Sequence, residues 1–522
     1  MTLAHTLWSN RHSSNSVSLM SDPIQSLLQQ AITHHQQGRL QIAEDAYAQV
    51  LQINPRQFDA LHLIGLIAKQ RGDHETALNF FAKAIQVDAR QAKVHCNLGA
   101  TLQELGKSKE ALACYELAIA LQADYPMAWN NRGNCLRHLD RHEEALESFT
   151  KAMELQIAYP DAYLNRAVCL QDLNEHEHAL LDLEDALRLR PHYPAAQFAR
   201  GFSLQQLRHY ELALAAYELA YDASSSPQQQ ASVMCNQGMI LAKLKRDEEA
   251  LVTFTRAIEI RPNFGNAYLQ LGHLYRSTHQ QPAAVQAYQS ALQYLSDQAL
   301  REQVRYLLAS LGQEAIPSAA PITYVKELFD QYAEHFDAHL QERLAYRIPE
   351  LLQQALQGLT VNKTLSSLDL GCGTGLCADY LRSVSTSLTG VDVSENMLAK
   401  AAQRGNYNEL VCDDIVHYLQ QGQLRFDLIL AADVLVYFGD LGSVFELVKH
   451  KLVQGGLFAF SVELSDSAEI HLHQTQRYQH SRAYIAKMAQ QFGFQIAHCE
   501  SHVGRHEAQT EVNSLIVVLR AL

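Results

Sequence analysis

The chain has 522 residues, of which 47% are hydrophobic and 19% charged, so we expect a folded protein with at least two hydrophobic cores rather than a disordered one. Its formal net charge of −14 argues against a nucleic-acid partner, because phosphates would be repelled, and no apolar run is long enough to span a membrane. The nine cysteines are scattered without a C-x-x-C pair, which predicts a cytoplasmic protein with reduced thiols and no metal.

Residues 1–22 are rich in Ser, Asn and His, and we expect them to be disordered; Met20 is a candidate for the true start of the protein. From residue 23 to residue 297 the sequence repeats with a period of roughly 34 residues. A small residue recurs on the first helix of each expected hairpin and a large apolar one on the second. This pattern predicts eight helical hairpins, and residues 298–311 predict a further amphipathic helix that caps them.

These repeats resemble the tetratricopeptide repeat (TPR) family, and the resemblance implies an all-α superhelical solenoid whose groove binds a protein or peptide. The same polar position in four of the repeats is similar to the asparagine ladder of O-linked N-acetylglucosamine transferase: Asn97, Asn131, Asn165 and Asn236. A side-chain amide can both donate to and accept from an extended peptide, which would make these residues partner-binding. Alternatively, the column is a polar position that was copied with the repeat.

The period changes after residue 311. Residues 312–322 contain Ala and Pro and predict a short linker, and residues 323–360 predict helices that form a lid. Strands and helices then alternate, which predicts a doubly wound, mostly parallel sheet that binds ligand at the carboxyl ends of its strands. We expect seven strands within 323–522, at 367–370, 388–393, 409–412, 426–431, 457–462, 494–502 and 514–519.

The stretch LDLGCGTG places Asp369 at the end of the first strand and Gly371, Gly373 and Gly375 in the turn before a helix. Glycines there let backbone N–H groups approach a ligand closely. The spacing G-x-G-x-G does not match the dinucleotide fingerprint, and no Gly-Lys-Ser/Thr follows to make a P-loop. Asp392 ends the second strand, where a carboxylate can accept from both hydroxyls of a ribose.

Four motifs in order, LDLGCGTG, GVDVSENML, VCDDI and FDLILAADVLVYF, resemble class I S-adenosylmethionine-dependent methyltransferases from about Leu365 to the C-terminus. The resemblance implies an α/β Rossmann-like fold and S-adenosylmethionine as cofactor, without a metal. It also implies ten cofactor-binding residues: the glycine loop for the methionine portion, Asp392 for the ribose, and residues around the adenine or under the lid, namely Asp369, Gly371, Gly373, Gly375, Asp392, Met397, Asp413, Asp414, Ala432 and Tyr332.

The segment FDQYAEHFD, residues 329–337, resembles the lid of several small-molecule members, although an ordinary amphipathic helix would show the same aromatic stripe. On the acceptor side, RYQHSRAY resembles a segment of bacterial proteins that join TPRs to a methyltransferase domain. We predict that His480 is a base, that Arg477 binds an anionic group of the acceptor, and that Tyr478 lies beside them. A metal held by His471, His473 and His480 is not expected, because no further ligand completes the set.

Taken together, the sequence predicts a methyltransferase whose TPR domain recruits a protein substrate or a protein that carries the acceptor. Two alternatives stay open. The protein could be a non-catalytic TPR scaffold with a cofactor-binding regulatory domain. It could also methylate a small molecule and use its repeats for localisation or oligomerisation.

Overall fold

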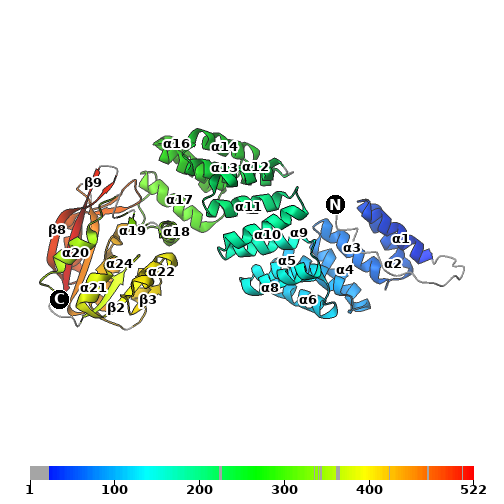
Figure 1. The fold of residues 1–522 in the computed structure, drawn as a ribbon, viewed down its shortest axis with the longest axis horizontal. Helices are drawn as coiled ribbons and strands as arrows, with labels where there is room; N and C mark the ends of the chain where they lie inside the picture. The colour runs from blue at the N-terminus through cyan, green and yellow to red at the C-terminus, as the bar shows by residue number, and fades with distance from the viewer. Residues whose placement is uncertain are drawn as a thin grey trace. The chain divides into compact units, whose positions relative to one another are not determined.

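The computed structural model describes residues 23–222, 226–333, 336–338, 340, 344–359, 365–422, 424–466, 469–507 and 510–522. The predicted disorder of residues 1–22 therefore concerns residues outside the described part. The chain divides into two compact units, Met1–Lys245 and Arg246–Leu522. The first contains helices only, and the second combines the last helices of the array with a sheet domain (Figure 1). None of the described helices is long and apolar enough to cross a membrane.

Helices with the predicted period fill residues 23–294. The first helix of each repeat is α1 (Pro23–Gln36), α3 (Phe58–Gln70), α5 (Ala92–Glu104), α7 (Pro126–Arg137), α9 (Pro160–Asp172), α11 (Pro194–Gln206), α13 (Pro227–Lys243) and α15 (Gly265–Ser277). The second is α2 (Leu40–Ile53), α4 (His74–Val87), α6 (Ser108–Leu121), α8 (His142–Leu155), α10 (His176–Leu189), α12 (Tyr210–Asp222), α14 (Asp247–Ile260) and α16 (Gln281–Tyr294). The all-α repeat architecture expected from the sequence is thus confirmed.

Small and large residues interlock between the two helices of a repeat. A Cβ placed on Gly133 would lie 2.6 Å from the ring of Phe149, and one on Gly65 would lie 2.7 Å from the ring of Phe81. Both rings are completely buried. Each glycine therefore leaves the space that the aromatic ring of the next helix fills, which is why the small and large columns recur together.

The turn inside each hairpin uses one left-handed residue. In the first three repeats this residue is glycine, with φ between 73° and 78° at Gly38, Gly72 and Gly106. The later repeats place a residue with a side chain there, for example Arg208 with φ of 61°. A left-handed residue ends the first helix and redirects the chain into the second, and glycine adopts it with the least strain.

Helix α17 (Gln298–Ser310) follows the last hairpin in the second unit. Its residues Val304, Leu307 and Leu308 are buried in one cluster with Tyr288 and other residues of α16. Its Tyr306 faces the sheet domain instead, in a cluster with Leu472 and Tyr478. The helix that covers the last repeat thus also packs on the sheet domain.

The sheet domain has nine strands in the order β3-β2-β1-β4-β5-β7-β6, with β9 pairing β5 and β8 pairing β9. Their bounds are β1 (Leu365–Leu370), β2 (Ser385–Asp392), β3 (Glu409–Cys412), β4 (Phe426–Ala431), β5 (Leu452–Leu464), β6 (Ile470–Leu472), β7 (Tyr478–His480), β8 (Phe494–Glu507) and β9 (Thr510–Ala521). All pairings among strands β1 to β5 are parallel, whereas β9 runs antiparallel to β5 and β8. The predicted α/β fold is confirmed, with the short hairpin β6–β7 added to the seven expected strands.

Helices cover both faces of this sheet (Figure 1). They are α18 (Ile322–Tyr332), α19 (Phe336–Ala338), α20 (Ile348–Leu356), α21 (Ala378–Val384), α22 (Glu395–Arg404), α23 (Ile415–Gln420), η2 (Leu435–Tyr437), α24 (Gly442–Lys451) and α25 (Arg482–Gln491). One core joins α23, α24 and α25 to the sheet around Phe445 and Phe458, and another joins α20 and α21 around Leu352 and Leu381. Two separate cores, one on each face, are what a doubly wound sheet requires.

The predicted linker 312–322 is not a free connector. Ala319 pairs with Phe438 in an antiparallel bridge, and the carbonyl of Ser318 accepts from the N–H groups of Gly439 and Asp440 at 2.8 and 3.0 Å. The carbonyl of Pro317 accepts from the hydroxyl of Tyr478 at 2.8 Å. The local sequence of residues 312–322 could not reveal these contacts, because the partners lie more than a hundred residues downstream.

Candidate functional site

The turn after β1 has glycine at three of its five positions, 371–375. Gly371, Gly373 and Gly375 have φ of 62°, 53° and 83°, all in the left-handed region. A Cβ on Gly371 would lie 2.3 Å from Cγ2 of Val434, so glycine lets this turn approach the loop after β4. A Cβ on Gly373 would meet no described atom within 4 Å, because Gly373 borders an open cavity. At Gly371 and Gly373 the turn therefore brings its backbone to the cavity without a side chain in the way.

Two buried carboxyl groups lie beside this turn. Asp392, at the end of β2, accepts hydrogen bonds from the N–H groups of Gly373 and Ser394, both at 2.9 Å. Asp369, in β1, accepts from the hydroxyl of Tyr407 at 2.7 Å. Burial raises the pKa of Asp392. Burial, opposed by the Tyr407 bond and aided by the charge of Asp392, raises the pKa of Asp369 to about 7. Neither carboxyl forms an ion pair within the described residues, so this corner favours a cationic ligand.

The cavity that these groups border has a volume of about 370 Å³, within the usual range for small-molecule sites. Its polar wall holds the glycine turn together with Asp369, Asp392 and Asp414. The lining also includes aromatic residues, namely Phe329, Phe336, Tyr346, Tyr437 and Phe438. The cavity thus combines a few polar groups with a largely apolar lining, as is usual for small-molecule sites.

The segment above the cavity is fastened at two points. Asp330 of α18 accepts from the hydroxyl of Ser394 at 2.6 Å, and that hydroxyl also caps α22. Asp337 of α19 accepts from the hydroxyl of Thr374 in the glycine turn and pairs with Arg404 at 2.6 Å. Between these points the ring of Phe329 lies edge-on to Phe336, with ring centres 5.9 Å apart. Phe329 and Phe336 of this segment line the cavity, and its action as a lid stays a prediction.

Asp433, Arg477 and Arg505 also line the cavity, and together with Glu463 they form a charge-balanced quartet. Arg477 pairs with Asp433 and with Glu463, each at 2.6 Å, and Arg505 pairs with Glu463 at 2.5 Å and with Asp433 at 3.6 Å. The two arginines hold the pKa of Asp433 below its ordinary value despite its burial. Asp433 has φ of 60°, a strained conformation for a residue with a side chain. Arg477 also lies over the ring of Tyr437, 5.5 Å from its centre.

The structure brings six of the ten predicted cofactor residues to the cavity: Asp369, Gly371, Gly373, Asp392, Asp414 and Ala432. The lining does not include Gly375, Met397, Asp413 or Tyr332. Met397 is fully buried, Asp413 pairs with His417 at 2.7 Å, and Tyr332 is 45% exposed. Sequence reasoning missed Val393, Ile415 and Val416, which line the cavity. They directly follow the predicted carboxylates, and that adjacency could have identified them.

Of the three predicted acceptor-side residues, Arg477 alone belongs to the cavity lining. His480 is fully buried, and its Nε2 donates to the carbonyl of Gly439 at 2.9 Å. Burial lowers the pKa of His480 to about 4. Tyr478 is also fully buried. The structure thus places His480 outside the cavity, because hairpin β6–β7 turns its ring towards the loop at Gly439. The prediction that it acts as a base rested on sequence proximity alone.

The hairpin that carries Arg477 is held from the repeat side. The hydroxyl of Tyr306, in α17, donates to the backbone carbonyl of Gln476 at 2.6 Å, and Tyr306 is 1% exposed. The hydroxyl of Tyr324 donates to the side chain of Gln476 at 3.3 Å. Gln476 has a φ of 60°. A strained residue next to Arg477 is thus fixed by a helix of the array.

The predicted asparagine column forms hydrogen bonds between successive repeats. Asn97 Nδ2 lies 2.8 Å from His62 Nε2, and Asn165 Nδ2 donates to Asn130 Oδ1 at 2.9 Å. Asn131 Nδ2 lies 3.6 Å from Cys96 Sγ. Asn236 bonds the side chain of Tyr217. Part of the hydrogen-bonding capacity of each amide is thus used inside the array.

Comparisons with known proteins agree with this architecture. A family model described as a methyltransferase domain matches residues 336–499, and tetratricopeptide repeat models match residues 28–92, 92–125, 124–192 and 231–264. The chain joins tetratricopeptide repeats to a methyltransferase domain. The glycine turn and the carboxylates Asp369 and Asp392 belong to this methyltransferase domain.

Two curated relatives are similar to this chain. Malonyl-[acyl-carrier protein] O-methyltransferase from Pseudescherichia vulneris is 30% identical over 148 residues, which is 28% of this chain and 57% of the relative. Ubiquinone biosynthesis O-methyltransferase from Bradyrhizobium diazoefficiens is 29% identical over 99 residues, 19% of this chain and 39% of the relative. The chain spans about half the length of these relatives. The solved structure of YrrB, described as a TPR protein with an unusual peptide-binding site, is 26% identical with a TM-score of 0.30, covering 36% of this chain and 95% of that chain.

Proposed function

We propose that this protein is an S-adenosylmethionine-dependent O-methyltransferase that receives its acceptor from a protein bound to the repeats. The observation that supports this most is the pair of buried carboxyl groups, Asp369 and Asp392, beside a bare glycine turn and without a cationic partner among the described residues. A sulfonium cofactor carries a positive charge that would balance these carboxylates, and its ribose hydroxyls could donate hydrogen bonds to Asp392. The residues present therefore fit the cofactor.

When bound, the cofactor would supply an electrophilic methyl group, and the transfer is a direct displacement that depends mainly on alignment. In this reading Gly371 and Gly373 make room for the methionine portion, and Asp414, Ile415 and Val416 border the base. The lid residues Phe329 and Phe336 exclude water from the reacting atoms. Each of these residues lines the cavity.

The acceptor is best assigned as an oxygen that is already ionised, such as a carboxylate. None of the described residues lining the cavity is a histidine, and Asp433 is held in ion pairs, so the acceptor wall lacks an evident base. An ionised carboxylate needs none. Arg477 uses Nε and Nη2 in its ion pairs, which leaves Nη1 as a donor that can orient the acceptor. Both curated relatives are named O-methyltransferases.

The repeats and the name of one relative support a protein partner. The relative named malonyl-[acyl-carrier protein] O-methyltransferase has by its name an acceptor attached to a carrier protein. We propose that the acceptor of this protein is likewise attached to a protein, which the repeats bind. The asparagine column would contribute hydrogen bonds to that protein through side-chain atoms that are not used between repeats. Replacing Asn97 and Asn131 with Ala should weaken capture of the native partner. Unchanged capture by a folded double variant would contradict the role of this column.

The first test is calorimetric titration of S-adenosylmethionine and S-adenosylhomocysteine into the full chain. Asp392→Asn should weaken binding by at least about tenfold, because the carboxylate loses its charge and one acceptor. Asp413→Asn is the matched control, since Asp413 is a carboxylate at the same sheet edge that does not line the cavity. Absence of binding to the wild-type chain would overturn the proposal and favour the scaffold alternative.

The acceptor is identified with labelled methyl groups. The full chain is incubated with cell extract and labelled cofactor, and the product is treated with mild alkali, which releases methyl from a carboxylic ester but not from an ether or an amine. Label on a protein fraction that alkali removes supports a carried carboxylate. Alkali-stable label would contradict the carboxylate assignment, and label on a free metabolite alone would favour the small-molecule alternative.

A further inference from the structure

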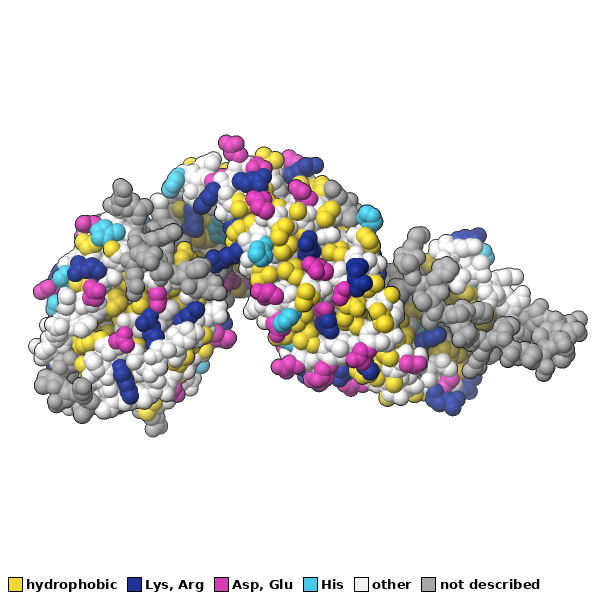
Figure 2. All heavy atoms as spheres, viewed as in Figure 1, with side chains coloured by type: hydrophobic (Ala, Val, Ile, Leu, Met, Phe, Trp, Pro, Cys, Tyr) yellow, Lys and Arg dark blue, Asp and Glu magenta, His cyan; other side chains and the backbone are white. Residues whose placement is uncertain are grey.

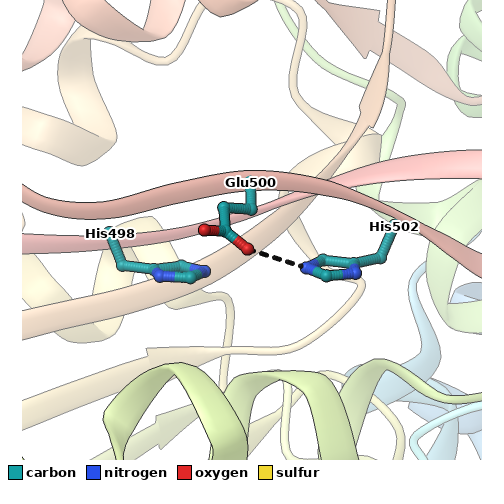
Figure 3. Close-up of side chains that lie close together, drawn as sticks. All are labelled: His498, Glu500 and His502. Carbon is teal, nitrogen blue, oxygen red and sulfur yellow. Dashed lines mark ion pairs between the residues drawn. The ribbon is translucent and has the colours of Figure 1, made fainter.

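Strand β8 carries a cluster of metal-ligating side chains away from the cavity. His498, Glu500 and His502 alternate along the strand and point from the same face, with Glu500 between the two imidazole rings (Figure 3). One ligand atom of each residue lies within 4.8 Å of those of the other two. None of the three lines the cofactor cavity. The cluster is thus a separate feature that the proposed methyl transfer does not use.

The surroundings hold these side chains close together. In the described sheet, β8 forms a strand ladder with β9 alone. Its other edge bonds Arg482 at the carbonyl of Cys499 and residues 344–347 at Gly504 and His506. The residues opposite His498 and Glu500 on β9 are Val518 and Ile516, both fully buried, which form an apolar base on the same face. Both histidines are half-buried, and Nε2 of His502 lies 3.5 Å from Oε2 of Glu500. Ion access remains open because the Glu500 side chain is 64% exposed.

One polar group beside the cluster has unused bonding capacity. Ser514 lies opposite His502 in the ladder and is 1% exposed. Its hydroxyl has no hydrogen-bond partner among the described residues. A hydroxyl on this face can accept a bond from the second ring nitrogen of a ligating histidine or from a metal-bound water, and such outer contacts commonly orient metal ligands.

We propose that His498, Glu500 and His502 bind a divalent transition-metal ion, with Zn²⁺ as the first candidate. Two imidazole nitrogens and one carboxylate oxygen form a ligand set that Zn²⁺ uses with bonds of about 2.0–2.2 Å, which places ligand atoms about 3.4 Å apart. Rotation about the outer side-chain bonds would shorten the present distances between the three ligand atoms to this value. Imidazole is a poor ligand for Mg²⁺ or Ca²⁺, which prefer oxygen. The fourth position faces water, so the ion would be exchangeable.

The expectation of a metal-free protein rested on cysteine spacing and on His471, His473 and His480, which are elsewhere in the chain. The pattern His-x-Glu-x-His at 498–502 was visible in the sequence. The pattern predicts a metal site only if the segment is a strand, because alternate residues of a strand point to the same face.

The test is calorimetric titration of ZnCl₂ into the metal-stripped full chain, with matched variants on the same strand. The wild type should take up one equivalent, and His502→Gln and Glu500→Gln should each weaken uptake by at least about tenfold. His506→Gln is the control, because His506 is an exposed histidine of β8 that pairs only loosely with Glu511, at 4.0 Å. Its affinity should equal that of the wild type.

Co²⁺ provides an independent spectroscopic check. Bound by imidazole and carboxylate, it should show visible bands without a sulfur-to-metal charge-transfer band. A charge-transfer band would place the ion on cysteine and overturn the proposal. So would a wild-type chain that takes up no Zn²⁺ up to about 1 mM, or equal losses in the His502 and His506 variants. Circular dichroism confirms that each variant is folded, and none of these results depends on methyltransferase activity.

Discussion

Replacing Tyr306 with Phe tests whether a helix of the repeat array sets the shape of the methyltransferase site. The substitution removes one hydroxyl and leaves the buried ring in place. The carbonyl of Gln476 then loses a 2.6 Å hydrogen bond in a region where the donor is 1% exposed. An unsatisfied buried group costs about 1–3 kcal/mol. Since Gln476 is also strained at φ of 60°, we expect the hairpin to open more often without this bond.

The assay is hydrogen exchange of residues 470–480, measured in the full chain by mass spectrometry. A loss of about 1.4 kcal/mol corresponds to roughly tenfold faster exchange of these amides. Tyr288→Phe is the matched control. Tyr288 is equally buried, but its hydroxyl bonds Nδ1 of His273 at 3.0 Å inside the last repeat hairpin. The reasoning is refuted if the Tyr306 variant is folded and its hairpin exchanges as slowly as that of the wild type or the control.

Three further results are expected. Gly371→Ala should lower the free energy of unfolding of the methyltransferase domain by about 2–4 kcal/mol in urea denaturation, since its Cβ would meet Val434 and its φ is 62°; a loss below about 0.5 kcal/mol would contradict this. Because the folded-state pKa of Asp369 is raised to about 7, the native protein holds a proton that the unfolded chain releases near pH 4. The free energy of unfolding of the ligand-free protein should therefore fall as pH rises from about 4 to about 7, by at most about 4 kcal/mol, and Asp369→Asn should flatten this slope. Arg208→Gly should stabilise the repeats by about 0.5–1 kcal/mol in thermal unfolding, whereas Gly106→Ala should destabilise them.

The parts of the site that sequence predicted are those that depend on local chain geometry. Asp369 and Gly371 lie within three residues of each other, and Asp392 ends the next strand, so the alternation of strand and helix brings them together. The repeats were predictable for the same reason, because each hairpin is built from neighbouring residues. Periodicity reports contacts of this kind directly.

The missed features depend on contacts between distant segments. The partners of Arg477 are Asp433 and Glu463, which come from the ends of two other strands. His480 became a core residue because its short strand pairs with the far end of β5. Neither pairing leaves a periodic trace in the sequence. On the face shown in Figure 2, the Lys and Arg side chains of the described residues are interspersed with Asp and Glu.

The two fastenings of the lid bear on how long a bound molecule stays. Asp330 is bonded to the cap of α22, and Asp337 to the glycine turn and Arg404. A molecule under Phe329 leaves only after these bonds break, and each contributes on the order of 1–3 kcal/mol when a charged group takes part. Release would then be governed by the opening of the lid rather than by contacts with the ligand. We expect a long residence time for the product, with a rapid first turnover followed by a slower steady state.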